Sequence, residues 1–413
     1  MHTPRSRLIA HLFFGFALLA ALLGAAIRAT PVRAATLTVT NTNDSLFYGN
    51  AAAEGGGAIV NFESLTINDS TFSGNSSPVG GGAITNLDSL TVNDSTFSDN
   101  LTSGGNGAAI ASNGTLMLSD STLARNVSTE QGGGLFVIGG TASITGSTFS
   151  DNSAEHAGGI YSLPGTTIMV ANSTFSGNTA SSMGGGVYND GTATFINSTF
   201  SGNVADDAGG IFNAGTLNYA NTIIANSAGG DCVLFLGSSI GTNTNNLVED
   251  GSCSPAFSGD PSLDSLGDNS GPTQTIALLP GSTALDAGNS TTCAASPVNN
   301  SDQRGRPRPI NTTCDIGVYE ADYLVVTKAA DTNDGTCDSD CSLREAIAAA
   351  DASADLDAIR FNGNYTITLA SALSSTLPNG FTEDDLMIDG KGYNVVIDGN
   401  GSDRIIETHD NFH

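Results

Sequence analysis

Carboxylates are the side chains of this 413-residue chain with the most obvious potential for catalysis. Asp206 and Asp207 form the only adjacent acidic pair between residues 35 and 230, and Asp151, Glu155 and His156 could share one face with them. A glycoside hydrolase needs carboxylates roughly 5–10 Å apart for acid–base or nucleophilic work. Hydrolysis at Asp206 and Asp207 is one interpretation of the pair. A loop that its acids keep soluble is the other.

Basic residues are too scarce for the usual chemistry of a pectate lyase. Such an enzyme needs an Arg or Lys base, acids that bind calcium, and further cations for the uronate chain. Arg125 is the single Lys or Arg between Ala35 and Gln303, and the Gly-His-Gly and Arg-x-Lys motifs of polygalacturonases are absent. We therefore predict a protein without enzymatic activity. A polysaccharide lyase or a glycoside hydrolase that uses Asp206 and Asp207 is the alternative.

One acidic stretch has the composition of a calcium site. The segment "DTNDGTCDSD" offers hard oxygen ligands of the kind that Ca²⁺ prefers. Gly335 and Thr336 depart from the order of an EF-hand loop, so a site here would have its own geometry. We expect no other cofactor. The predicted ligands are Asp331, Asn333, Asp334, Asp338 and Asp340.

The charge distribution limits the possible partners. The formal net charge is −28, and the one basic cluster consists of Arg304, Arg306 and Arg308. A protein that binds nucleic acid needs Lys and Arg to displace counterions, so we expect no nucleic-acid partner. The three arginines are expected either to pair with acids at the end of the repeat region described below or to hold a ligand.

Six cysteines lie in the second half of the chain, and an even number in an exported protein indicates disulfides. The separations of 21, 21 and 4 residues favour three local bridges, although six cysteines allow 15 pairings. The preferred pairs are Cys232 with Cys253, Cys293 with Cys314, and Cys337 with Cys341.

A repeat of about 25 residues must position these groups. A large apolar residue recurs every 24 to 26 residues, at Phe47, Phe72, Phe97, Leu123, Phe149, Phe175, Phe200 and Ile224. An Asn follows three places later, at Asn50, Asn75, Asn100, Asn126, Asn152, Asn178 and Asn203. Glycine pairs such as Gly185–Gly186 begin most units. A fixed period of this length indicates a repeat architecture.

The short β-type runs within each unit predict an all-β fold, a right-handed parallel β-helix with three strands per coil. About seven coils of 25 residues would occupy residues 35–230. Identical positions stack about 4.8 Å apart in such a solenoid. We therefore expect an internal column of Phe72, Phe97, Phe149, Phe175 and Phe200, and a ladder of the repeated asparagines at a corner in the left-handed conformation. The glycine pairs are expected at tight corners.

The motifs "GGAI" at Gly56–Ile59 and Gly81–Ile84, with Phe-x-x-Asn at Phe72–Asn75, resemble the repeats of chlamydial-type polymorphic outer membrane proteins. The resemblance covers about residues 35–230. It implies a surface β-helix involved in adhesion. The autotransporter barrel of that family has no counterpart in this sequence, so that part does not carry over.

Two later segments resemble other bacterial surface modules. "DPSLDSLGDNSGPTQTIALLPGSTALDAG", with "DQRGRPR" and "DIGVYE", is similar to a choice-of-anchor Q domain, which we expect to form a cap over residues 231–321. "DGTCDSDCSLREAI" resembles the CSLREA motif, which opens a β-helix. Ser342 and Glu345 form a capping box for a short helix there. The module at 322–413 stops within its strand pattern, so we expect it to be truncated.

The first 34 residues have the pattern of a signal peptide, with Arg5 and Arg7, an apolar run and a terminal Ala34. After its removal no stretch predicts a membrane-spanning helix. We expect a secreted monomer on the cell surface or outer membrane of a bacterium. Its role would be structural or adhesive, and its ligand, a cell-surface protein or a glycan, would bind along the side of the rod.

Overall fold

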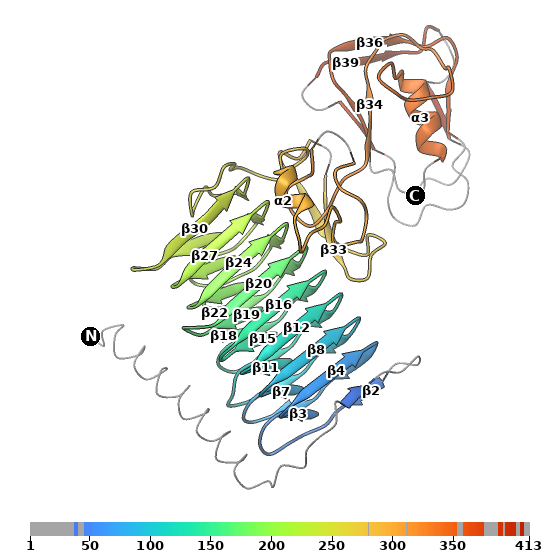
Figure 1. The fold of residues 1–413 in the computed structure, drawn as a ribbon. Coiled ribbons are helices and arrows are strands. Elements are labelled where there is room, and N and C mark those ends of the chain that lie inside the picture. The colour runs from blue at the N-terminus through green and yellow to red at the C-terminus, as the bar shows by residue number, and fades with distance from the viewer. Residues whose placement is uncertain are drawn as a thin grey trace.

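The computed structural model describes residues 37–39, 45–279, 281–310, 313–352, 358–375, 387–390, 393–401 and 405–408. Within this part the chain forms a parallel β-helix, a segment that packs on its side, and a smaller C-terminal β module (Figure 1). Nine-stranded sheets in the solenoid correspond to about eight turns, one more than the sequence predicts. The predicted signal peptide lies outside the described residues.

Five of the coils contribute four strands each, rather than the predicted three, because a fourth short strand forms after the repeated Asn. One complete coil runs through β7 (Ile84–Asn86), β8 (Ser89–Asn93), β9 (Thr96–Ser98) and β10 (Leu101–Thr102). Equivalent residues of successive coils pair in register, as Leu90 does with Leu116 and Phe97 with Leu123. Hydrogen bonds therefore run along the solenoid axis and link every coil to the next.

Two of the sheets are nine-stranded. Sheet A consists, in spatial order, of β1 (Leu37–Val39), β4 (Ser64–Asn68), β8, β12 (Thr115–Ser119), β16 (Thr141–Thr145), β20 (Thr167–Ala171), β24 (Thr192–Ile196), β27 (Thr216–Ala220) and β30 (Ser239–Thr244). Sheet B consists of β2 (Ser45–Tyr48), β5 (Ser70–Ser73), β9, β13 (Thr122–Ala124), β17 (Thr148–Ser150), β21 (Thr174–Ser176), β25 (Thr199–Ser201), β28 (Ile223–Ala225) and β31 (Leu247–Val248).

The other two solenoid sheets have five and eight strands. Sheet C consists of β6 (Ser76–Ser77), β10, β14 (Val127–Ser128), β18 (Ser153–His156) and β22 (Thr179–Met183). Sheet D consists of β3 (Ile59–Asn61), β7, β11 (Ile110–Ser112), β15 (Leu135–Val137), β19 (Ile160–Ser162), β23 (Val187–Asn189), β26 (Ile211–Asn213) and β29 (Cys232–Leu234). Because β29, β30 and β31 belong to these stacks, the solenoid continues beyond residue 230.

The motif "STFSGN" encodes one stretch of sheet B and the corner that follows. Its Phe points inward, and Phe175 stacks on Phe200 with ring centroids 4.4 Å apart. Its Asn is buried. Asn100 Oδ1 accepts hydrogen bonds from the backbone N–H and Nδ2 of Asn75, both at 2.9 Å, and its own Nδ2 donates to the Phe72 carbonyl. The left-handed residue is the one before the Asn, where Gly, Asp or Arg stands, and not the Asn itself as predicted.

The glycine pairs are required by close packing rather than by backbone conformation. Gly158 and Gly159 do not have positive φ; in this unit the preceding Ala157 does. A Cβ on Gly159 would lie 2.4 Å from the carbonyl oxygen of Gly186 in the next coil and 3.2 Å from Cδ1 of Phe175. The pairs thus let adjacent coils and the aromatic column approach each other, which corrects the expectation that they turn the chain.

The described residues between 261 and 321, here called the lateral segment, pack along the side of the solenoid instead of over its end. The segment contains the antiparallel pair β32 (Leu263–Gly267) and β33 (Thr275–Leu278) and the short helix α2 (Ser290–Ala294). Gln303 Nε2 donates to Thr148 Oγ1 at 3.0 Å, and Thr174 Oγ1 donates to Gln303 Oε1 at 2.7 Å. The segment therefore covers outward-facing residues of sheet B at β17 and β21.

The C-terminal module has small parallel sheets around helix α3 (Leu343–Ala352). The predicted capping box is present, since Ser342 Oγ accepts from Glu345 N–H and Glu345 Oε2 accepts from Ser342 N–H. The apolar face of α3 is buried in the core of the module. Its strands are β34 (Tyr323–Val326), β35 (Ala358–Phe361), β36 (Tyr365–Thr368), β37 (Leu373–Ser375), β38 (Met387–Asp389), β39 (Val395–Asp398) and β40 (Ile406–Thr408).

Candidate functional site

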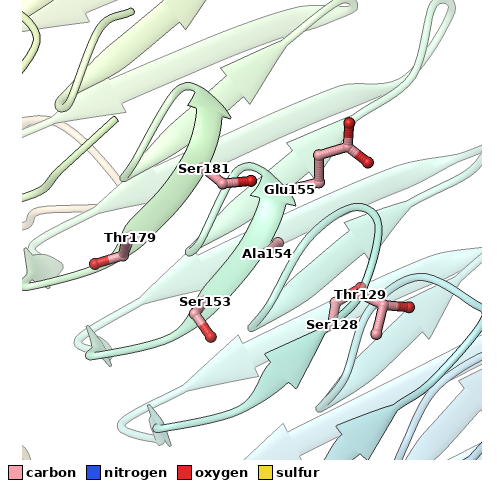
Figure 2. Close-up of a pocket in the computed structure, with 7 residues that line it drawn as sticks. All are labelled: Ser128, Thr129, Ser153, Ala154, Glu155, Thr179 and Ser181. Carbon is pink, nitrogen blue, oxygen red and sulfur yellow. The ribbon is translucent and has the colours of Figure 1, made fainter. Parts of the chain in front are cut away.

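Sheet C has a shallow groove on its outer face, with a volume of about 430 Å³. The groove spans three adjacent strands, β14, β18 and β22 (Figure 2). Strand alternation explains which side chains reach it: Ser153 and Glu155 face out, whereas Ala154 between them is buried. The lining residues are Ser128, Thr129, Ser153, Ala154, Glu155, Thr179 and Ser181.

The groove offers hydroxyl groups and a single carboxylate. Ser128 is fixed at its base, because Ser128 Oγ donates to the carbonyl oxygens of Gly105 and Gln131. Glu155 carries the only charge among the lining residues, and its side chain is 48% exposed. Aliphatic side chains are exposed in the same outward column, at Val127 below Ser153 and at Val204 above Thr179. This arrangement can hydrogen-bond hydroxyl or amide groups and contact small apolar faces.

The acidic residues selected from the sequence do not gather in this groove, apart from Glu155. Asp206 and Asp207 are both exposed and line neither cavity described here. Asp207 pairs with Met183, which pairs with His156, so Asp207 and His156 lie two rungs apart, or roughly 10 Å along the axis. Asp151 occupies a left-handed corner position between sheets B and C.

Arg125 has a structural partner one coil below. Its Nε and Nη2 each donate to a carboxylate oxygen of Asp99 at 2.9 Å. Both residues occupy the left-handed corner position before the ladder Asn. The hydrogen bond from Arg125 lowers the pKa of Asp99. The single basic residue of the repeat region is thus used in an exposed ion pair between coils.

The predicted calcium ligands are directed to separate partners. Asp331 forms an ion pair with Arg344 at 2.8 Å, and Asp340 lies 3.2 Å from Lys328 Nζ. Asn333, Asp334 and Asp338 each accept a backbone N–H two residues later. Within the described ranges, no cluster of three or more His, Cys, Asp or Glu side chains is placed to hold a metal ion. Calcium binding here stays an untested prediction.

The basic cluster has its partners within the lateral segment, and not at the end of the solenoid as one expectation had it. Arg304 Nη2 lies 2.8 Å from Asp302 Oδ2, and Arg308 Nε lies 3.5 Å from Glu320 Oε2; all four side chains are almost fully buried. Arg306 donates its backbone N–H to Asp302 Oδ1. Burial lowers the pKa of Arg308 and raises the pKa of Glu320.

The three disulfides join the pairs favoured by spacing: Cys232 with Cys253, Cys293 with Cys314, and Cys337 with Cys341. The first closes the last coils of the solenoid. The second anchors α2 in the lateral segment, and Nδ2 of Asn197 and Asn221 each donate to Cys293 Sγ at 3.2 Å. The third lies directly before α3.

A second aromatic column was missed by the sequence reasoning. Phe136, Tyr161, Tyr188 and Phe212 form a column on the outer face of sheet D, and Leu163 after β19 and Met183 at the end of β22 pack against it. Burial raises the pKa of Tyr161 well above its usual value and that of Tyr188 to about 12. The signal was the aromatic in the "GGLF", "GGIY", "GGVY" and "GGIF" variants, which recurs at the repeat period.

A second cavity, of about 370 Å³, lies between the outer face of sheet A and α2. Its lining includes Thr194, Asn218 and Thr242 on the sheet and Thr291, Thr292 and Ser296 on the lateral segment. No helix in the described part of the chain has the length and hydropathy needed to cross a membrane.

Comparison of the sequence with models of known families identifies a repeat that fits the observed coils. The model of the Chlamydia polymorphic membrane protein repeat matches residues 44–61, 69–86 and 172–190. The chain is a β-helix protein, and these three segments are similar to the repeats of that family. The matched segments include β3, β5, β7 and β23 and the Asn ladder positions Asn50 and Asn75. The matched segments therefore contain strands of sheets B, C and D, and none of sheet A.

No curated protein sequence matches the chain. Among solved structures, a mutant of the PL6 family alginate lyase AlyGC is similar, with 12% identity and a TM-score of 0.18. That alignment covers 91% of this chain and 74% of the lyase. A similarity at this level does not bear on the activity of the chain.

Proposed function

We propose that this protein is a structural and adhesive β-helix of a bacterial surface that binds its ligand along the side of the solenoid. One observation carries the proposal: sheet C leaves hydroxyls, a carboxylate and aliphatic side chains exposed around a groove. Two other faces are covered: sheet B in part by the lateral segment, and sheet D by side chains such as Leu163 and Met183. Ligand binding without catalysis requires only such a fixed, accessible surface.

The chemistry of the groove favours a neutral glycan over an anionic one. The seven lining residues include five with hydroxyl groups, and Glu155 would repel a uronate or sulfate group. The net charge of −28 acts in the same direction at longer range. A neutral protein loop is the other ligand that this surface could accept.

The proposal places the mature chain outside the cell as a monomer. The repeat type supports a surface location. The signal-like residues 1–34 and three disulfides, which form in oxidising compartments, support export. Hydrogen bonds between every pair of coils would make the solenoid a stiff rod that holds the groove away from the cell.

A glycan array and a cell-binding assay with the mature protein test the proposal. Thr179→Tyr places a bulky ring in the groove, and Thr115→Tyr makes the same change at an exposed position of sheet A as the control. Binding that is lost in Thr179→Tyr and kept in Thr115→Tyr is the expected result. Equal binding by both variants would remove the groove from the proposal.

The same preparation separates adhesion from catalysis. It is incubated with plant and microbial polysaccharides, and new reducing ends or unsaturated products are measured. We expect no turnover. Product formation that disappears in Asp207→Asn would replace the adhesive proposal with an enzyme at Asp206 and Asp207.

A further inference from the structure

The cavity between sheet A and α2 has two walls from different parts of the chain. On the solenoid, Thr194 of β24 pairs in register with Asn218 of β27, and the backbone N–H of Thr242 in β30 donates to Asn218 Oδ1 at 2.8 Å. The opposite wall is formed by Thr291 and Thr292 of α2 and by the residues just after it. A cleft between two packed units is a common position for a small-molecule site.

The α2 wall is held firmly against the solenoid. Asn289 donates its backbone N–H to Asn221 Oδ1 at 2.8 Å, and Asn221 Nδ2 donates back to the Asn289 carbonyl. Asn289 also caps α2 by accepting from Thr292 N–H. The bridge between Cys293 and Cys314 fixes the helix within the lateral segment. The cavity is therefore preformed and needs no ordering step before it binds a ligand.

The lining of the cleft combines uncharged hydroxyl groups with small apolar surfaces. Five Ser and Thr hydroxyl groups line the cleft, and in the described part of the chain none of them has a hydrogen-bond partner. The sixth lining hydroxyl, that of Tyr219, donates to the Cys253 carbonyl instead. Each of the five Ser and Thr hydroxyls can both donate and accept, as a sugar hydroxyl can. Ile196, Ala220 and Ala295 add apolar surface that suits the C–H face of a pyranose ring. No lining residue is ionisable at neutral pH, so the cleft has no countercharge for an ionic ligand.

We propose that this cleft binds a short, uncharged saccharide of one or two rings. Its volume of about 370 Å³ lies at the small end of the range for ligand pockets, which limits the number of rings. The site is distinct from the sheet C groove, since the two share no lining residue. The proposal does not depend on the adhesive function.

The test is a titration of the full mature chain followed through the methyl NMR signals of Ile196 and Ala295. The probes are cellobiose, maltose, lactose and N,N′-diacetylchitobiose, with digalacturonate as the charged comparison. Thr194→Val together with Thr292→Val removes a hydroxyl from each wall at nearly constant volume. Thr141→Val, on an exposed position of sheet A outside the cleft, is the matched control.

We expect at least one neutral disaccharide to shift both methyl signals saturably. The double variant should then weaken binding about 5- to 100-fold, as the loss of two hydrogen bonds predicts, and Thr141→Val should not. Three results would each overturn the proposal: no neutral probe shifts the signals at millimolar concentration, digalacturonate binds as tightly, or the double variant binds like the wild type. Thr179→Tyr in the sheet C groove should leave this titration unchanged. A failure of the cleft proposal can therefore be distinguished from a failure of the adhesive proposal.

Discussion

Phe175 and Phe200 stack face to face one coil apart, with ring centroids 4.4 Å apart and ring planes 5° from parallel. Both side chains are completely buried. The spacing is close to the rise of one coil, so each ring covers its neighbour and excludes water between them. The same contact joins Phe149 to Phe175 at 4.8 Å. This column is the part of the core from which the stability of the solenoid can best be tested.

Phe175→Ala should lower the free energy of unfolding by about 3–5 kcal/mol, because it removes a buried ring and leaves a cavity between two others. Denaturant unfolding of the mature protein measures the change. Phe235→Ala, at a half-exposed position beyond the second aromatic column, is the control and should cost much less. An unchanged midpoint for Phe175→Ala would contradict the buried column.

The Asn ladder gives a second stability prediction. Asn152 Nδ2 donates to Leu123 O and to Asn178 Oδ1, and Asn152 Oδ1 accepts from Asn126. Asn152→Ala leaves at least one buried polar group without a partner and should cost about 1–3 kcal/mol. Asn50 is exposed at the first position of the ladder, so Asn50→Ala should cost less. If thermal unfolding showed equal losses of stability for Asn152→Ala and Asn50→Ala, burial would not be what determines the contribution of a ladder Asn.

Close approach between coils can be tested at Gly159. In Gly159→Ala the new Cβ would lie 2.4 Å from the Gly186 carbonyl oxygen. Because the two atoms are attached to the backbones of paired coils, neither can rotate away as a side chain could. We expect a loss of about 1–3 kcal/mol or more, as for other overpacked cores. Gly267→Ala is the control, because its Cβ would meet nothing closer than 3.9 Å and its φ is not positive. Comparable unfolding midpoints for the two variants would refute the packing explanation.

The C-terminal module should lose stability in acid through Glu345. Burial raises the pKa of Glu345, but hydrogen bonds from the Ser342 and Asp334 backbone N–H groups and the contact with Lys328 outweigh it and bring the pKa to about 2. A carboxyl whose pKa is lowered by folding contributes stability above its unfolded value. That contribution should disappear as the pH falls from about 4.5 through about 2.

Hydrogen exchange of α3 across this pH range measures the effect. Glu345→Gln should flatten the acid dependence by removing the titrating group. Glu63→Gln, at an exposed position of the repeat region, should leave it unchanged. An acid dependence that survives in Glu345→Gln would assign the loss to another carboxyl.

The sequence alone was sufficient to predict the parallel β-helix, because a constant period places residues that are one coil apart directly above each other. Phe72 stacks on Phe97, and Asn75 bonds Asn100, for that reason alone. The disulfide pairs were also accessible, since each joins cysteines that are close in the chain. Periodicity, however, does not show how many strands a coil contains, and three of the five sheet C strands have only two residues, too few to give a pattern.

Tertiary structure decided the position of everything that does not repeat. Gln303 reaches Thr148 and Thr174 across more than a hundred residues, and Arg308 turns to Glu320 rather than to an acid of the solenoid. No spacing rule predicts such contacts, because they depend on how one irregular segment fits the side of a regular rod. Both candidate sites arise in this way: one is a face that no described segment covers, and the other is the gap left where α2 packs against sheet A.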